Sequence, residues 1–312
     1  MTRPSEFLSG PARLGAVAIV AATGLAIPQA QAQFCCSGPP PNDVTDYGVL
    51  YEGDPHDLNF SNSTVTSNIG IGDTGGFVGF GSGTITGQVR FSAEDIGQYN
   101  PNGITVTGGA TFGNESVQVN LDALNALSES LRNKGGTPLL IAAGNSVNAS
   151  AGMLDPNGNE VFTATISPNF TAGTTFTVNG TSSQFVVLNT TTGGLPFNGS
   201  IALTGGITSD HVLFNFDPGN FDTLSGGDPL VIDTNGNTTT GTFLDPNGDF
   251  QIIDTVLNGR VFGGDTLDSG IFNSVIVAPP LFRVPEPTSL ALLGAGLVAL
   301  GLIGRRRRPL AR

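Results

Sequence analysis

The stretch STVTSNIGI, residues 63–71, recurs in altered form as GTITGQVRF at 83–91 and as ITVTGGATF at 104–112. The copies start roughly 20 residues apart. In each copy polar and apolar residues alternate, the alternation is interrupted at Gly or Asn, and it then resumes. A fixed period of this length is typical of a β-solenoid, in which apolar side chains stack inward from coil to coil. Gly and Asn suit the corners, where the backbone needs a positive φ.

The rest of the body also favours β structure. Gly is abundant, with 45 residues, and Phe occurs 20 times, so the chain can form a core and frequent turns. We predict further strands over residues 138–143, 161–166, 174–178, 184–188, 199–206, 210–216, 257–262 and 271–278. The expected fold is mainly β, a helical solenoid with coils of about 20 residues; the alternative is a β-sandwich.

One segment has helical spacing instead. Leu121, Leu124, Leu127 and Leu131 fall on one face of a helix over residues 120–133. Asn120 is a candidate N-cap and Gly135 a candidate terminator. We expect this helix to dock its leucines on the flank of the β structure.

The order of β coils, one helix and further β coils resembles two groups of exported proteins. These are the choice-of-anchor A domain and the bacterial ice-binding-protein-like domain, and the resemblance spans residues 47–278. It implies a right-handed β-helix accompanied by a long α-helix.

The N-terminus has the pattern of a secretory signal peptide over residues 1–32. A basic start and an apolar stretch precede the small residues Ala30 and Ala32, which mark a cleavage site. A linker follows at 33–46, where Cys35 and Cys36 are the two cysteines of the chain and residues 39–41 are prolines. Neighbouring cysteines disfavour a bond to each other, so we expect no internal disulfide framework. The solenoid is assigned to residues 47–282.

The C-terminal segment 283–312 has three parts in order. Val284, Pro285, Glu286 and Pro287 precede the uncharged, apolar residues 289–304, and Arg305, Arg306, Arg307 and Arg308 follow. The apolar part predicts a transmembrane helix held by cytoplasmic arginines. The segment resembles the PEP-CTERM sorting signal. That resemblance implies an exosortase-type sorting enzyme as partner, transient single-pass anchoring in the inner membrane, and delivery to the cell surface or extracellular matrix.

The body between these segments is strongly acidic. Residues 33–282 hold 4 basic and 23 acidic residues, a net charge of 4 − 23 = −19. This charge argues against nucleic acid as a partner. It is compatible with calcium or with a hydrated extracellular polysaccharide.

Catalytic signals are weak. There are two histidines, far apart in sequence, and no nucleophile elbow or zinc motif. Carboxylates such as Glu52, Glu94, Asp95 and Glu115 could pair as in a polysaccharide-active β-helix enzyme, an alternative that stays open. The absence of Trp speaks against a sugar cleft, and we predict that the protein is not an enzyme.

Three loops, DPNGN at 155–159, DTNGN at 233–237 and DPNGD at 245–249, place oxygen ligands at alternate positions. Calcium loops use this spacing, although the same residues make β-turns without metal. With two carboxylates, Asp245, Asn247 and Asp249 form the one candidate calcium site, and no other cofactor is expected.

The repeats also contain paired threonines: Thr64 and Thr66, Thr84 and Thr86, and Thr105 and Thr107. In a solenoid these would stack as a ladder on one face, which could bind ice or another flat crystal surface. Threonine is equally a common exposed strand residue. We therefore predict an exported structural or adhesive protein, with ice binding as the first alternative.

Overall fold

The computed structural model of the chain describes residues 44–53, 55–94, 98–132, 134–190, 197–216, 230–245, 248–264 and 268–279. The signal segment, residues 33–43 of the linker and the sorting segment lie outside this part of the chain. The described strands pair in parallel with one exception, β11 with β12. This parallel ladder is that of a β-helix, as predicted, and it excludes the antiparallel alternative, a β-sandwich.

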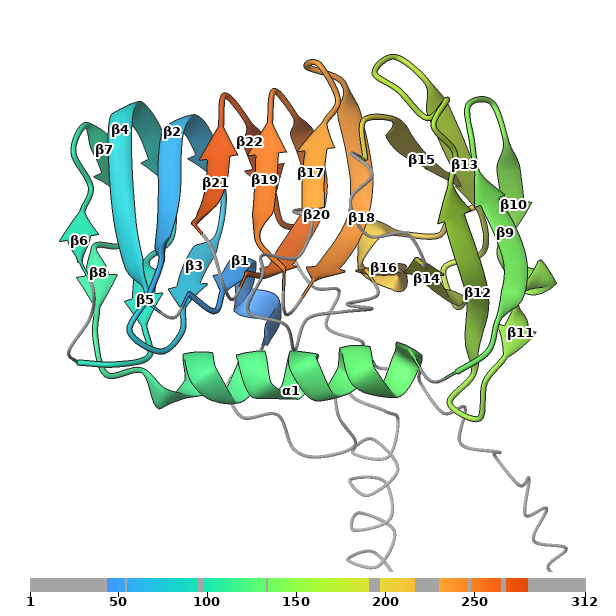
Figure 1. Cartoon of the computed structure of the whole chain (residues 1–312), viewed down its shortest axis with the longest axis horizontal. Coiled ribbons are helices and arrows are strands. Elements are labelled where there is room, and N and C mark those ends of the chain that lie inside the picture. The colour runs from blue at the N-terminus through green and yellow to red at the C-terminus, as the bar shows by residue number, and fades with distance from the viewer. Residues whose placement is uncertain are drawn as a thin grey trace, which may run out of the picture. The chain divides into compact units, whose positions relative to one another are not determined.

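The strands form three faces along the β-helix (Figure 1). The first, the helix face, contains β8 (Ala110–Thr111), β5 (Val89–Phe91), β3 (Asn68–Ile71), β1 (Tyr47–Tyr51), the second halves of β20 (Val256–Gly263) and β18 (Thr238–Asp245), β16 (Val212–Phe216), β14 (Phe185–Thr190), β12 (Asn159–Ile166) and β9 (Thr137–Ile141). Strand β11 (Met153–Leu154) lies beside the start of β12.

The second face, called here the threonine face, contains β7 (Ile104–Val106), the second halves of β4 (Gly76–Ile85) and β2 (Asp57–Val65), β22 (Val275–Val277), and the first halves of β20 and β18. Beside β18 lie β15 (Ser200–Thr204), β13 (Thr175–Asn179) and β10 (Ser146–Asn148). The third face contains β6 (Tyr99–Asn100), the first halves of β4 and β2, β21 (Ser269–Phe272), β19 (Phe250–Ile253) and β17 (Leu230–Asp233).

The order of the coils in space differs from their order in the sequence. Strand β1 pairs with both β3 and β20, and β2 pairs with β4, β21 and β22. The described part of the chain therefore starts in the middle and coils toward one end. Helix α1 (Glu115–Arg132) then spans the helix face, and coiling resumes at the other end and returns to the middle (Figure 1).

The predicted repeat sets the register of the first coils. Val65 aligns with Ile85, which aligns with Val106, and Ile69 aligns with Val89. Val65, Ile69, Ile85 and Val89 are fully buried, so the inward positions of the repeat form the core. Burying each such side chain contributes about 1.5–3 kcal/mol relative to leaving it exposed.

Asn and Asp occupy sharp corners between the third face and the threonine face. Asn62, Asn235, Asp254 and Asn273 all have positive φ, as the sequence predicts for such corners. A buried hydroxyl follows the corners at Asn62, Asp254 and Asn273. Ser63 accepts the Ser274 N–H at 2.9 Å, Thr255 accepts the Thr234 N–H at 3.0 Å, and Ser274 accepts the Thr255 N–H at 3.1 Å. The predicted single strand 271–278 is wrong for this reason, because the corner at Asn273 and Ser274 divides it into β21 and β22.

Helix α1 begins earlier than predicted. It starts at Glu115, and Asn120, the predicted N-cap, is buried inside the helix. Asn114 fixes the start, because its side chain donates to the carbonyl of Phe91 and to Thr111 Oγ1, both at 3.1 Å.

The expected docking of the helix is present. Val117, Leu121, Leu124 and Leu131 are buried and belong to the same apolar cluster as the outward residues of the helix face, namely Leu50, Val161, Val187, Leu213, Leu244 and Phe262.

Candidate ligand-binding face

The structure places the six repeat threonines on the threonine face. Thr64 aligns with Thr84, and Thr84 with Thr105, on three neighbouring strands. Adjacent strands are about 4.8 Å apart. Thr66, Thr86 and Thr107 lie two residues further along, about 6.7 Å at strand rise, and each donates its backbone N–H to the neighbouring strand. These second three are exposed, as is Thr105, while Thr64 and Thr84 are half-buried.

The rows continue beyond the repeat with different residues. On the next strands the outward positions are Val275 and Val277 on β22, Val256 and Asn258 on β20, and Thr238 and Thr240 on β18. Further along, the Thr204 hydroxyl donates to Asn179 Oδ1 at 3.1 Å, and the Asn179 amide donates to Asn148 Oδ1 at 2.8 Å. The threonine array is therefore one part of a longer surface of hydroxyl, methyl and amide groups.

This face carries no charge. None of the nine strand segments that form it, as described, contains Asp, Glu, Lys or Arg, although residues 33–282 hold 23 acidic residues. In the sequence, the only sign of this uncharged face is a set of separate short segments that lack Asp, Glu, Lys and Arg. It could be detected only once the coil register showed which segments share a face.

The three Asp-x-Asn-Gly loops differ in how their first carboxylate is bound. Asp155 accepts from Lys134 Nζ at 2.7 Å, from the backbone N–H of Asn157 and Asn159 at 2.8 and 2.9 Å, and from the Asn159 amide. Burial raises the pKa of Asp155, but these donors outweigh burial and lower it. Asp233 accepts the N–H of Asn235 at 3.1 Å. Both loops are satisfied β-turns.

The loop after Asp245 differs. Asp245 and Asp249 are each 3% exposed, and the Oδ1 atom of each is buried without a hydrogen-bond partner. Burial, and then the charge of Asp249, raise the pKa of Asp245 to about 8, and burial also raises the pKa of Asp249. Asn247, the third predicted ligand, lies outside the described residues. In the described ranges no group of three or more His, Cys, Asp or Glu side chains could hold a metal.

The carboxylates considered for catalysis differ in their surroundings. Glu52 is 9% exposed and accepts the amides of Asn125, at 3.0 Å, and Gln118, at 3.5 Å, so it fastens α1 to the helix face. Glu94 and Glu115 are exposed, and Asp95 lies outside the described residues.

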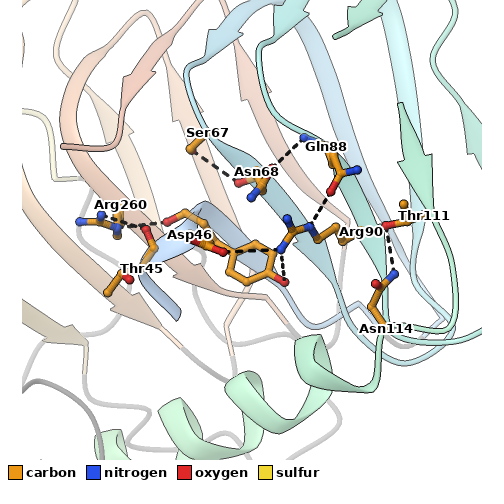
Figure 2. Close-up of polar contacts among 10 residues, drawn as sticks. Thr45, Asp46, Ser67, Asn68, Gln88, Arg90, Thr111, Asn114 and Arg260 are labelled. Atoms are coloured by element: carbon orange, nitrogen blue, oxygen red, sulfur yellow. Dashed lines mark hydrogen bonds and ion pairs between the residues drawn. The ribbon is translucent and has the colours of Figure 1, made fainter. Parts of the chain in front are cut away.

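A polar cluster that the sequence did not indicate lies where the body begins (Figure 2). Arg90 Nη1 lies 3.8 Å from Asp46 Oδ2, and its guanidinium sits over the Tyr47 ring, 5.5 Å from the centroid. Arg260 is 3% exposed and donates to the carbonyl oxygens of Tyr47 and Thr45 at 3.1 and 3.2 Å. It also donates to the carbonyl of Pro279 at 2.8 Å.

The described body is thus a β-helix with a docked α-helix and an uncharged face. The sorting residues Val284–Pro287, the cluster Arg305–Arg308 and the cleavage residues Ala30 and Ala32 lie outside the described residues. At the level of sequence, residues 283–308 match the family model of the PEP-CTERM protein-sorting motif. The chain therefore carries this motif, which marks it for export and sorting. Within the described part of the chain, no helix is long and apolar enough to cross a membrane.

Comparison with curated proteins gives no match. Among solved structures, a glycosylated ice-binding protein from Arctic yeast has 12% identity and a TM-score of 0.47, with 78% of this chain and 94% of that chain covered. The DUF3494 domain of ice-binding protein 1 from Shewanella frigidimarina has 11% identity, coverage of 76% and 96%, and a TM-score of 0.44. An ice-binding protein from an Antarctic Flavobacteriaceae bacterium has 14% identity, coverage of 77% and 47%, and a TM-score of 0.42. At these identities and TM-scores, the ligands of the similar structures cannot be transferred to this chain.

Proposed function

We propose that the protein acts outside the cell as a non-enzymatic structural and adhesive protein, which binds a neutral polysaccharide of the extracellular matrix through its threonine face. The observation that carries this proposal is the uncharged, nine-strand face with in-register threonines on a body of charge −19. Such a body repels polyanions, and an uncharged face of hydroxyl and amide groups suits a neutral polymer rich in hydroxyls.

The sorting motif supports the location. On this proposal, the motif at residues 283–308 directs the chain through the membrane to an exosortase-type enzyme, and the body then works at the surface or in the matrix. The threonine face lies on strand segments other than those against which α1 packs. On β18 and β20, which contribute to both faces, the helix packs against Leu244 and Phe262 in the second halves, so it does not bury the threonine face.

The test is binding of the purified chain to insoluble neutral polysaccharide, with Thr84→Lys and Thr105→Lys combined. Lysines at two neighbouring positions of the threonine rows add bulk and charge, so retention should fall at least tenfold. Asn59→Lys is the matched control, because Asn59 is half-buried on the third-face half of β2 and its substitution should leave retention unchanged. Equal retention of all three proteins would reject the threonine face as the binding surface.

Ice binding is the second candidate, favoured by one observation. The threonines repeat in two directions, across strands and along them, as the sites on a crystal surface do. Inhibition of ice recrystallisation, lost in the Thr84→Lys and Thr105→Lys variant and kept in Asn59→Lys, would establish this candidate. No inhibition by the unsubstituted chain would reject it and leave polysaccharide binding in place.

A further inference from the structure

Asp245 lies in a row of aligned strand positions whose side chains on other strands belong to the core. It aligns with Gly263 on β20, Gly263 aligns with Tyr51 on β1, and Tyr51 aligns with Ile71 on β3. Tyr51 and Ile71 are fully buried. A carboxylate in this row loses its hydration, and an unpaired buried charge is strongly unfavourable.

Asp249 brings a second carboxylate to the same corner. It directly precedes β19 and is 3% exposed. A Cβ on Gly248, between the two acids, would lie 2.5 and 2.8 Å from the Oδ2 and Oδ1 atoms of Asp245. A larger residue would collide with that carboxylate, so the close approach of the loop backbone to Asp245 requires glycine at this position.

The Gly248 backbone bonds to Asp245 and the Gln251 side chain to Asp249, but the Oδ1 atom of each acid has no partner. Other donors of the described chain bind other acids. The Asp57 N–H donates to Asp268 Oδ1 at 2.9 Å, and His56 Nδ1 lies 3.5 Å from the same oxygen. Gln98 donates to Asp57. Among the described residues no ion pair includes Asp245 or Asp249, whereas Asp155 in the similar loop has Lys134.

We propose that Asp245 and Asp249 together bind one calcium ion, coordinated by their Oδ1 atoms. Two carboxylates balance the charge of a divalent cation, and the ion supplies the partner that both buried oxygens lack. Because no third acidic or histidine ligand joins them in the described chain, backbone carbonyls and water complete the shell. Calcium accepts such irregular oxygen shells, whereas Mg²⁺ demands near-ideal octahedral geometry and zinc prefers Cys and His.

The test measures the thermal midpoint of the purified full-length chain at pH 7.5, after treatment with EGTA and then with millimolar CaCl₂ or MgCl₂. Calcium should raise the midpoint by several degrees, as expected when a ligand binds the folded state alone, and Mg²⁺ should raise it less. Equilibrium dialysis with calcium should give one bound ion per chain.

Three variants make the test specific. Asp245→Asn and Asp249→Asn should lose the calcium response, and dialysis on Asp249→Asn keeps the test valid if Asp245→Asn does not fold. Asp233→Asn changes the satisfied loop and should keep the response. An unchanged midpoint with calcium in the unsubstituted chain, an equal response in Asp249→Asn, or a chain that is stabilised by acid and indifferent to calcium would overturn the proposal. The last result would mean that the pair shares a proton.

Discussion

The Arg260 side chain joins the two ends of the body: its Nη2 donates to the carbonyl of Pro279 at 2.8 Å and to that of Thr45 at 3.2 Å, 215 residues before Arg260. Thr45 lies just before the first strand, and Pro279 lies four residues before the start of the sorting motif at 283. The first and last coils of the described body are neighbours in the middle of the β-helix. A single side chain can therefore contact both Thr45 and Pro279.

Replacing Arg260 should therefore loosen both ends together. Arg260→Met keeps the apolar stem but removes hydrogen bonds from a charged donor to three carbonyls, with a cost of about 3 kcal/mol in the free energy of unfolding. Urea denaturation measures this loss. The control is Arg132→Met, because Arg132 pairs with Glu129 at the surface of α1 and should cost below about 1 kcal/mol. Equal losses in the two variants would contradict the role of Arg260.

A second prediction concerns the docking of α1. Asn215 is fully buried; it accepts the Ser128 hydroxyl at 2.6 Å and donates to Asn189 Oδ1 at 3.0 Å. Asn189 in turn donates to the carbonyl of Leu131 at 2.9 Å. Asn215→Ala leaves several of these groups unpaired and should cost about 2–4 kcal/mol.

Hydrogen exchange locates the effect of this change. Amides in the second half of α1 should lose protection in Asn215→Ala, while those of β2 and β4, far along the β-helix, keep theirs. Uniform loss of protection across the chain would indicate global destabilisation instead of loosened docking.

The buried hydroxyl ladder supports a third prediction. Ser274 Oγ accepts the Thr255 N–H at 3.1 Å and donates to the carbonyl of Phe272 at 2.7 Å, and the Ser274 N–H donates to Ser63 Oγ. Ser274→Ala leaves the Thr255 N–H without its acceptor inside the protein, at a cost of about 1–3 kcal/mol. Ser61→Ala, at a half-buried site on the neighbouring strand β2, is the control and should change the unfolding free energy by less than about 0.5 kcal/mol.

The repeat made the coils predictable because its inward residues recur at a constant period, and Val65, Ile85 and Val106 stack as that period requires. The closure between Ser63 and Ser274 was not predictable, because nothing local marks two residues 211 apart as neighbours. The leucine stripe predicted α1, but not its first turn, which Asn114 fixes through contacts with an earlier coil. The charge-free face likewise needed the register before its segments could be placed together.

The last prediction concerns pH in calcium-free buffer. Asp245 has a folded-state pKa of about 8, against an ordinary value of 3.8 for an exposed aspartate. Since the folded pKa is raised, the folded state holds the proton that the unfolded state releases above about pH 4. The stability contribution is thus fully present below that pH and is lost as pH rises toward 8, at up to about 1.4 kcal/mol per pH unit. The raised pKa of Asp249 acts in the same direction.

Urea denaturation in EGTA from pH 4 to 8 measures this slope. Asp245→Asn removes the titrating group, so its stability should vary much less over the range and exceed that of the unsubstituted chain at pH 8. Parallel slopes for the two proteins would place the titration elsewhere. With calcium bound, the unsubstituted chain should keep its stability up to pH 8, because the cation then replaces the proton as the partner of the two buried carboxylates.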